Sequence, residues 1–394
     1  MTAHTSLVRP GSTLLLESGS LRGKRVGILC NHASVDRGLA HIVDELSAAD
    51  GVTLAAIFGP QHGFRSDVQD NMIETPHRDD PHRRVPIYSL YSETREPTAE
   101  MLRGLDVLVI DLQDIGARIY TYIYTMANCL KAASRQGLPV VVCDRPNPIG
   151  GHDVEGPVLE NGFQSFVGQY PIPMRHGMTI GELARLFNEH FGIGAKLEVV
   201  KMRGWSRDQH FCDTGLPWVL PSPNIPTPDT AMVFPGGVLF EGTNVSEGRG
   251  TTRPFELVGA PWVDRDAERF AAALNSRGLS GVYFRPAYFE PTFHKHAKVA
   301  CGGCQIHVTD RASFRPVAAG VALLDAFKRA SPADFQWRQP PYEYEYTKPP
   351  IDILYGSTKL REALDAGASA DDLVRSWESG VRAFLPIREK FLLY

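Results

Sequence analysis

The first 200 residues alternate between short runs of β-branched apolar residues and longer amphipathic stretches. This alternation is typical of a parallel sheet with helices on both of its faces. The apolar runs that we expect to be strands begin at Lys24, Val52, Asp106, Leu138 and Leu197, and helices are expected over 39–49, 98–103, 120–136 and 179–191. The last helix begins with the spacing of a capping box, Thr179 followed by Glu182. The pattern predicts an α/β fold with a Rossmann-like, doubly wound parallel sheet.

The segment PSPNIPTPDT, which follows Trp218, indicates a domain boundary. Its prolines remove backbone donors and exclude a central strand or a helix interior. A chain of 394 residues also exceeds the size at which one hydrophobic core usually stops growing. We therefore expect a Rossmann-like α/β domain over 1–218 and a smaller C-terminal α+β auxiliary domain over 219–394. In the second domain, helices are expected over 264–276, 316–330, 358–366 and 370–384, and strands over 281–289 and 303–310.

Charge and hydropathy exclude two classes of partner. A net charge of −4 provides no broad positive field for nucleic acid or for an anionic membrane. No stretch approaches the roughly 20 apolar residues that cross a bilayer, and the first residues lack the basic-then-apolar layout of a secretory signal. The sequence predicts a cytoplasmic enzyme that acts on a small molecule, and it leaves the oligomeric state open.

Neither a metal nor a nucleotide cofactor is expected. The six cysteines are too sparse for a disulfide framework, and the CxxC of Cys301 and Cys304 has no second CxxC or paired histidine motif beside it. We interpret the three thiols that lie inside apolar runs as core residues, and the CxxC as buried or glycine-flanked thiols. The first strand continues into CNHASVDRG, which lacks the GxGxxG turn of a dinucleotide site, and no GxxxxGK[ST] motif is present.

Polar side chains follow four of the expected strands. They are Asn31 and His32, Gln61 and His62, Asp111 and Asp114, and Asp144, Arg145 and Asn147. Because ligands of open parallel sheets bind outside the carboxyl ends of the strands, these residues are candidates for one shared site. Asp111 and Asp114 precede Arg118 and Tyr120, so acid, base and sugar-stacking groups occur together. The alternative is structural: Asp114 caps the helix, and Arg118 pairs with a carboxylate.

Two later segments add candidate binding residues. Arg175 and His176 precede a helix N-terminus, where backbone N–H groups favour an anion. Ser222 and Asn224 are followed by a glycine-rich run whose backbone can approach a ligand closely. The candidates in that run are Glu241, Thr243, Asn244, Glu247, Arg249 and Thr251. The alternative is an ordinary long surface loop.

Several long motifs resemble one family. The segments VLVIDLQDIGARIYTYIYTM, DRPNPIGG, MRHGMTIGELA, WVLPSPNIPT and LFEGTNVSEGRGTTRPFELVGAPW are similar to the YbbC-like, or NamZ, family of exo-β-N-acetylmuramidases. The resemblance implies a glycoside hydrolase that releases N-acetylmuramic acid from the non-reducing end of peptidoglycan fragments, as in peptidoglycan recycling. It also implies a cleft between the two domains and no dinucleotide. The lactyl carboxylate of such a sugar needs a cation, for which Arg118, Arg145, Arg175 and Arg249 are candidates, with Arg249 or Arg175 expected first.

One position departs from the family. Characterised members resemble a PEHG motif with a proposed catalytic glutamate, whereas this chain has Gln61 in PQHG. An amide cannot protonate a leaving oxygen. The nearest replacements in sequence are Asp67, Asp70 and Glu74, of which Glu74 has the longer reach and is the expected acid. We further expect the cleft to be lined by Asp111, Asp114, Asp144 and Glu247 together with Gln61 and His62.

Three functions therefore remain open. The first is a glycosidase for a muramic-type amino sugar, with retaining, inverting and substrate-assisted mechanisms all possible. The second is an α/β enzyme that acts on another sugar acid or on a phosphosugar. The third is a sugar-binding family member that lost catalysis together with the glutamate.

Overall fold

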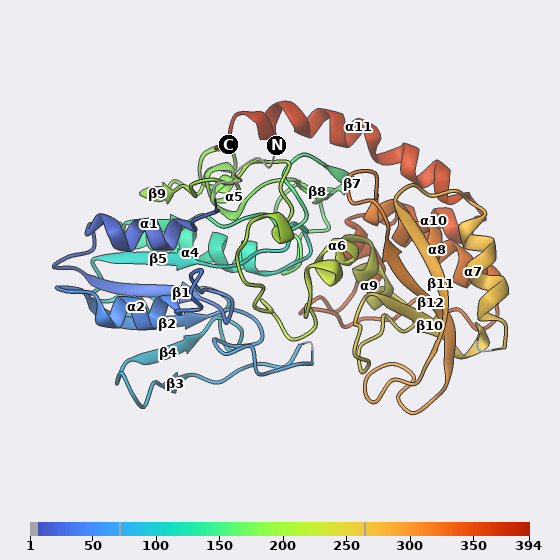
Figure 1. Cartoon of the computed structure of the whole chain (residues 1–394), viewed down its shortest axis with the longest axis horizontal. Helices are drawn as coiled ribbons and strands as arrows, with labels where there is room; N and C mark the ends of the chain where they lie inside the picture. The colour runs from blue at the N-terminus through green and yellow to red at the C-terminus, as the bar shows by residue number, and fades with distance from the viewer. Residues whose placement is uncertain (1–6, 71, 264) are drawn as a thin grey trace.

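The computed structural model describes residues 7–70, 72–263 and 265–394. Figure 1 shows an elongated molecule with a large sheet towards one end and a smaller sheet towards the other. Helix α11 (Ala370–Glu389) runs along one side and joins the two parts.

The large sheet has seven strands in the order β3-β4-β2-β1-β5-β6-β9. The strands are β1 (Arg25–Cys30), β2 (Thr53–Gly59), β3 (Arg78–Asp79), β4 (Pro86–Ser89), β5 (Val107–Asp111), β6 (Val140–Cys143) and β9 (Leu197–Val200). All neighbours pair in parallel except β3 and β4. The predicted fold class and the five predicted strands are confirmed, and β3 and β4 extend one edge beyond the prediction.

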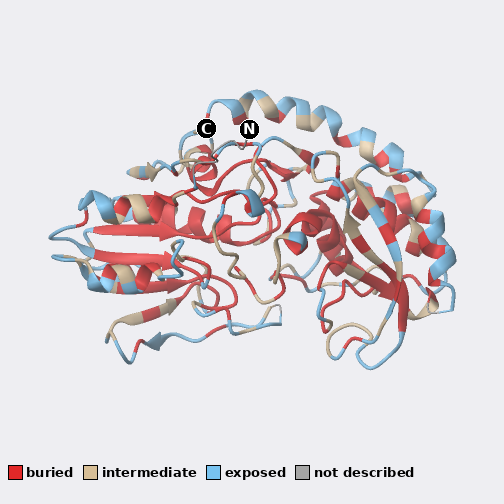
Figure 2. Cartoon of the chain, in the orientation of Figure 1, coloured by how far each residue is buried: buried red, intermediate tan, exposed pale blue. Residues whose placement is uncertain are grey.

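Helices cover both faces of this sheet. Within β1, Ile28 packs into one core cluster with Leu15 of α1 (Gly11–Ser18) and Leu46 of α2 (Ile42–Ala48). The next residue, Leu29, packs on the opposite face with α4 (Tyr122–Gln136) and α5 (Ile180–Arg185). Successive strand residues point to opposite faces, so a strand that is buried on both sides reads as a continuous apolar run. Figure 2 shows these central strands as almost wholly buried.

The other predicted helices in this part are also present. Helix α3 (Ala99–Leu102) is short, and α5 continues as a π-helical turn, η1 (Leu186–His190). The capping box of Thr179 and Glu182 is formed by both of its hydrogen bonds. A two-stranded sheet of β7 (Glu155–Val158) and β8 (Pro173–Arg175) lies outside the main sheet.

The second part is built on a three-stranded antiparallel sheet in the order β10-β12-β11. Its elements are α6 (Pro228–Gly237), η3 (Val238–Gly242), β10 (Leu257–Ala260), α7 (Ala267–Asn275), β11 (Val282–Phe289), β12 (Cys301–Val308), α8 (Pro316–Ala330), α9 (Pro350–Tyr355) and α10 (Lys359–Asp365). The expected strands and helices of the α+β part are present, whereas α6, β10 and α9 were not predicted. Helix α6 starts inside the proline-rich segment because proline is tolerated at the first helical position, where no N–H bond is needed.

The two parts are tied together at the C-terminal end of α11. The Tyr394 hydroxyl donates to Asp144 at 2.7 Å, and the Leu393 amide donates to Glu182 at 2.8 Å. One hydrophobic cluster runs from the first sheet through α6 and α8 to α11. The boundary between residues 218 and 219 stays a prediction.

No disulfide joins the six cysteines, which all lie within the described ranges: Cys212 is exposed, and the other five, including Cys301 and Cys304 of β12, are buried. Among the described residues, no group of three His, Cys, Asp or Glu side chains could hold a metal ion. Over the same ranges, no helix combines the length and the apolarity that a bilayer crossing requires.

Candidate active site

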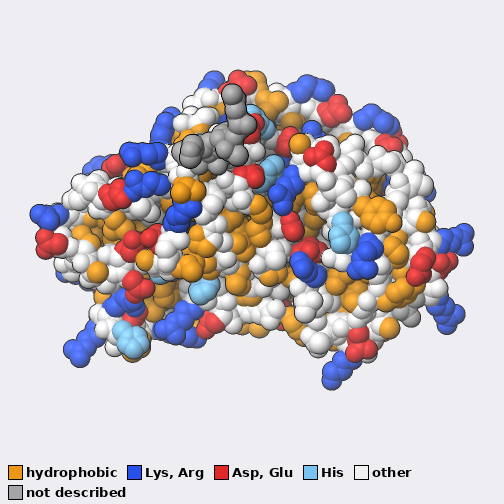
Figure 3. All heavy atoms as spheres, viewed as in Figure 1, with side chains coloured by type: hydrophobic (Ala, Val, Ile, Leu, Met, Phe, Trp, Pro, Cys, Tyr) orange, Lys and Arg blue, Asp and Glu red, His pale blue; other side chains and the backbone are white. Residues whose placement is uncertain are grey.

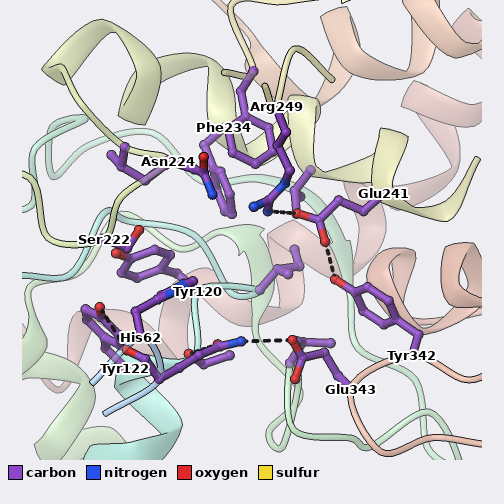
Figure 4. Close-up of a pocket in the computed structure, with 17 residues that line it drawn as sticks. His62, Tyr120, Tyr122, Ser222, Asn224, Phe234, Glu241, Arg249, Tyr342 and Glu343 are labelled. Atoms are coloured by element: carbon purple, nitrogen blue, oxygen red, sulfur yellow. Dashed lines mark hydrogen bonds and ion pairs between the residues drawn. The ribbon is translucent and has the colours of Figure 1, made fainter. Parts of the chain in front are cut away.

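A polar pocket lies where the loop after β2, the approach to α4, the proline-rich segment and the loops of the second part meet (Figure 4). About 460 Å³ of space between atoms lies among its lining residues, and part of that space is open to solvent. Its lining residues are Gln61, His62, Ile119, Tyr120, Thr121, Tyr122, Val167, Ser222, Asn224, Ile225, Phe234, Val238, Glu241, Arg249, Phe255, Tyr342 and Glu343. Seven of these were predicted as site residues: Gln61, His62, Tyr120, Ser222, Asn224, Glu241 and Arg249.

Glu343 is one of the two carboxylic side chains that line the pocket. It comes from the loop between α8 and α9, where Glu343 and Tyr344 both adopt positive φ angles, of 45° and 66°. Such a backbone costs energy in residues other than glycine and is found more often at functional sites. The Glu343 carboxyl accepts hydrogen bonds from Gln61 Nε2 at 3.0 Å and from the Tyr91 hydroxyl at 2.8 Å. Burial, reinforced by the negative charge of Glu241, raises the pKa of Glu343 to about 7.

Gln61 is fixed in orientation. Its Oε1 accepts the Thr121 hydroxyl at 2.8 Å, so its amide nitrogen faces Glu343. Thr121 stands at the N-terminus of α4, directly before Tyr122. The loop after β2 is thereby connected across the pocket to the loop that carries Glu343.

Glu241 and Arg249 form the opposite wall of the pocket (Figure 4). Arg249 Nη2 donates to Glu241 at 2.5 Å, and the Tyr342 hydroxyl donates to the other oxygen of Glu241 at 2.6 Å. The Arg249 side chain is only 5% exposed, and its Nη1 is buried without a hydrogen-bond partner. A buried guanidinium nitrogen with no partner is costly, so this donor is available to an anionic ligand.

A second set of charges supports Arg249 from behind. Glu247 is fully buried and pairs with Lys295 Nζ at 2.7 Å and with Arg249 Nε at 3.2 Å. Burial alone would raise the pKa of Glu247, but Lys295 and Arg249 together lower it to about 2. Glu247 is therefore an ionised anchor for Arg249 and does not line the pocket.

His62 is a neutral pocket residue. Its Nδ1 lies 2.7 Å from the carbonyl oxygen of Val68, and because a carbonyl only accepts, Nδ1 carries the proton. Burial lowers the pKa of His62 to about 4. Nε2 is then a hydrogen-bond acceptor near neutral pH.

The strand exits of β5 and β6 are closed by a buried ion pair. The Asp111 carboxylate accepts hydrogen bonds from Arg145 Nε at 2.5 Å and from Arg145 Nη2 at 2.7 Å. Both side chains are at most 4% exposed. Asp111 is the last residue of β5 and Arg145 follows β6, so the pair links the carboxyl ends of two neighbouring strands. We expected Asp111, Asp114, Asp144 and Glu247 to line one cleft with Gln61 and His62. None of these four carboxylic residues belongs to the lining of the pocket that contains Gln61 and His62.

Asp114 and Asp144 have structural partners. Asp114 Oδ2 accepts the amide of Gly116 at 2.8 Å, which stabilises a turn before α4 and does not cap the helix. Asp144 accepts the Thr179 hydroxyl and the Gly181 amide in addition to Tyr394. Burial raises the pKa of Asp144 to about 7. These carboxyls are therefore used to join elements of the fold.

Two of the candidate arginines bind backbone carbonyls. Arg118 is fully buried and donates to the carbonyl oxygens of Pro157, Ile172, Leu354 and Tyr355. Arg175, equally buried, donates to the carbonyl of Ile149 and pairs with Asp153. The suggested carboxylate partner of Arg118 is not found among its hydrogen bonds. Of the four candidate arginines, Arg249 lines the pocket.

The remaining predicted residues lie outside the pocket lining. Glu74 has a side chain that is 50% exposed, and its carboxylate accepts from Arg95 at 3.2 Å and from the Tyr344 hydroxyl at 3.1 Å. Asp70 is exposed in the same loop. Hydrogen bonds to nearby backbone atoms engage the side chains of Asn31, Asn147, His176, Thr243, Asn244 and Thr251.

Sequence reasoning missed Glu343, Tyr342 and Tyr91. The segment PPYEYEYTKPP has carboxylates between aromatic residues and is stiffened by prolines. That is the same combination by which the segment around Asp111 was judged to be a carbohydrate site. A signal was therefore present, but the loop lies 282 residues from Gln61 in the chain.

The raised pKa of Glu343 has a consequence for stability. Because the folded protein holds this carboxyl protonated up to about pH 7, the unfolded chain ionises first, and stability falls as the pH rises from about 4.5 to 7. We expect Glu343→Gln to be more stable than the wild type at pH 8, by up to about 3 kcal/mol, with little difference at pH 4. Urea unfolding at the two pH values measures this difference. At each pH, the free energy of unfolding of the wild type is subtracted from that of the variant. If this difference is smaller at pH 8 than at pH 4, the expectation is wrong.

A buried carboxyl with a raised pKa, beside polar and aromatic walls, defines a site for acid–base chemistry on a small polar ligand. The N-terminal domain of the exo-β-N-acetylmuramidase NamZ family matches residues 26–229, and the C-terminal domain of that family matches residues 232–394. The peptidoglycan β-N-acetylmuramidase NamZ of Bacillus subtilis (strain 168) is 45% identical, with 100% of this chain and 93% of that protein covered. The chain belongs to the NamZ family of glycoside hydrolases.

Solved structures of the same fold support this assignment. A crystal structure of a DUF1343 family protein from Bacteroides fragilis superposes with a TM-score of 0.88 at 36% identity, covering 98% of this chain and 99% of that one. A second DUF1343 protein from the same organism gives a TM-score of 0.77 at 28% identity, with 99% of both chains covered.

Proposed function

We propose that this protein is an exo-acting glycosidase that releases N-acetylmuramic acid from the non-reducing end of peptidoglycan fragments. The observation that carries the substrate assignment is the buried, unpartnered Nη1 of Arg249 in the pocket wall. N-acetylmuramic acid differs from N-acetylglucosamine by its lactyl ether, whose carboxylate matches a guanidinium donor. The pocket therefore distinguishes the two sugars by charge.

The other pocket walls suit a pyranose ring. Tyr120 and Phe234 offer aromatic faces, and Ser222 and Asn224 offer hydroxyl and amide groups for sugar hydroxyls and the acetamido group. His62 Nε2 accepts a hydrogen bond from a sugar hydroxyl. We further propose a role in peptidoglycan recycling in the cytoplasm, because an exo-acting enzyme releases single sugar units that can be reused. Cell fractionation tests the location.

Arg249→Lys tests the substrate assignment. Lysine keeps the positive charge but lacks the planar fork, so KM for an N-acetylmuramic acid glycoside should rise about tenfold or more. The matching N-acetylglucosamine glycoside has no carboxylate, and its KM should change less than about threefold. Steady-state kinetics with both chromogenic glycosides measure the two effects. Equal effects on both sugars would remove Arg249 from carboxylate binding.

The same assay addresses the other functions considered. A wild-type protein that prefers a different sugar acid or a phosphosugar, while Arg249→Lys still weakens binding, would identify an anion-specific enzyme of another substrate class. Binding of N-acetylmuramic acid without turnover would identify a sugar-binding family member.

A further inference from the structure

We infer that Glu343 is the proton donor to the glycosidic oxygen in this chain and that Gln61 is its positioning residue. This inference rests on the proposed glycosidase function. In the motif that PQHG resembles, a glutamate stands at the position of Gln61. Here the acid comes from a different segment, the loop between α8 and α9, and lies next to Gln61.

The contacts of Glu343 suit a proton donor. The carboxyl is 3% exposed and lines the pocket, and each of its oxygens accepts one hydrogen bond, from Gln61 or from Tyr91. A carboxyl group offers about four lone-pair sites, so both contacts leave room for the acidic proton. Tyr91 and Gln61 donate, and neither removes that proton. Both contacts also stabilise the carboxylate that remains after proton transfer.

Glutamine at position 61 is compatible with this role, and a second glutamate would change it. Two carboxyls in hydrogen-bond contact share a proton, and one of them acquires a strongly raised pKa. An amide has no charge to share. Since Thr121 fixes Gln61 Oε1, Gln61 Nε2 always faces Glu343. With glutamine at position 61, this residue is no longer an acid itself. It is a hydrogen-bond donor to the acid Glu343.

The groups that face Glu343 come from several elements. Tyr91 follows β4, Glu241 belongs to η3, and Arg249 and Tyr342 belong to the surrounding loops. Burial and Glu241 favour the protonated form, whereas Tyr91, Gln61 and Arg249 oppose that shift. With the resulting pKa of about 7, about half of the molecules carry the proton near neutrality, and the group can both donate and accept it.

The substrate's own acetamido group is the nucleophile in the first step. The electron pair of the bond from C1 to the glycosidic oxygen moves to that oxygen, which takes the proton of Glu343 and leaves as an alcohol. The acetamido carbonyl oxygen bonds to C1 and gives an oxazolinium ion beside the Glu343 carboxylate. A water oxygen then bonds to C1 as the bond from C1 to the acetamido oxygen breaks and its electron pair returns to the acetamido group. The water gives one proton to the Glu343 carboxylate.

Leaving-group dependence separates a proton donor from a structural residue. On a disaccharide with a poor leaving group, Glu343→Gln should lower kcat by about 10² to 10⁴-fold with little change in KM. On a 2,4-dinitrophenyl β-N-acetylmuramide, whose leaving group needs no proton, the first step should slow less than about tenfold. Burst kinetics isolate that step. Equal losses on both substrates, or no loss on the disaccharide, would overturn the inference.

The pH profile and a neighbouring carboxylate provide controls. The alkaline limb of kcat/KM for the disaccharide, expected near pH 7, should disappear with the dinitrophenyl substrate. Glu345→Gln changes a carboxylate in the same loop that caps Thr347 and Lys348 outside the pocket, and it should leave both rates within about twofold. If Glu74→Gln shows the leaving-group pattern and Glu343→Gln does not, the acid is Glu74 and the inference is wrong.

Gln61 variants test the positioning role. Gln61→Leu should lower kcat for the disaccharide and shift the alkaline limb, while Gln61→Glu should move that limb upward by adding a second acid. Unchanged pH profiles in both variants would remove Gln61 from the mechanism. The wild type could instead cleave only N-acetylglucosamine glycosides, while Glu343→Gln still shows the leaving-group dependence. That result contradicts the substrate assignment and supports the inference. A wild type that cleaves none of these glycosides overturns both.

Discussion

Asp111→Asn should lower the free energy of unfolding by about 3 to 5 kcal/mol, because it leaves the guanidinium of Arg145 buried without its counter-charge. The wild-type pair is bidentate, with both side chains at most 4% exposed, so solvent cannot replace the lost carboxylate. Urea denaturation measures the effect. Asp50→Asn removes one partner of the exposed pair between Arg22 and Asp50 and should cause little change.

Kinetics of the folded Asp111→Asn variant separate a structural role from a catalytic one. A residue outside the pocket should leave kcat/KM within about tenfold, whereas loss of a catalytic acid or base costs about 10² to 10⁴-fold. The double variant Asp111→Leu with Arg145→Met should recover part of the lost stability, since removing both charges leaves none unpaired. An inactive Asp111→Asn variant of wild-type stability would return Asp111 to the catalytic machinery.

Gly236→Ala should destabilise the protein by about 3 kcal/mol or more, because α6 and α8 touch backbone to backbone at this residue. A Cβ on Gly236 would lie 1.9 Å from the carbonyl oxygen of Pro316, and a Cβ on Gly320 would lie 2.5 Å from the carbonyl oxygen of Gly236. Neither contact is possible, so the helices must separate. Since α6 carries the pocket residue Phe234, activity should fall as well.

Thermal unfolding and kcat/KM of Gly236→Ala measure the two effects. Gly38→Ala is the matched control, because Gly38 is exposed and a Cβ there would come no closer than 3.4 Å to Asp36. The control should match the wild type in both measurements. A Gly236→Ala variant that unfolds at the wild-type temperature would show that the two helices have more freedom than their contact indicates.

Local chemistry made most of the elements predictable. The predicted strands β1, β2, β5 and β6 read as continuous apolar runs because they are largely buried on both faces, and α5 was marked by its capping box. Strand β9, at the edge of the sheet, was predicted from its apolar residues although it is only partly buried. Helix α6 escaped prediction because it begins at Pro228 within a proline-rich segment, and α9 because it spans only six residues and begins at the second of two adjacent prolines. Helix α8 also begins at a proline, Pro316, but its 15-residue length and apolar pattern made it predictable. In sequence, a proline that starts a helix resembles one that prevents a helix.

The candidate site was predictable in part. Gln61 was found from its position at a strand exit, and Glu241 and Arg249 were found in a glycine-rich run that permits close approach to a ligand. All three line the pocket. Strand-exit position gave the wrong placement for Asp111 and Asp144. Polar residues at strand ends bind a ligand only if other parts of the chain leave them exposed, and here Arg145 and Tyr394 satisfy them.

The sequence by itself determined the α/β class, the family and the absence of a carboxyl at position 61. Only the tertiary structure placed Glu343 at 3.0 Å from Gln61 and left Arg249 Nη1 without a partner in the pocket wall. Proximity between residues 282 positions apart depends on how the two sheets pack, and α11 and the shared core fix that packing. Burial, and with it the pKa of Glu343, follows from the same packing and is written in no local motif.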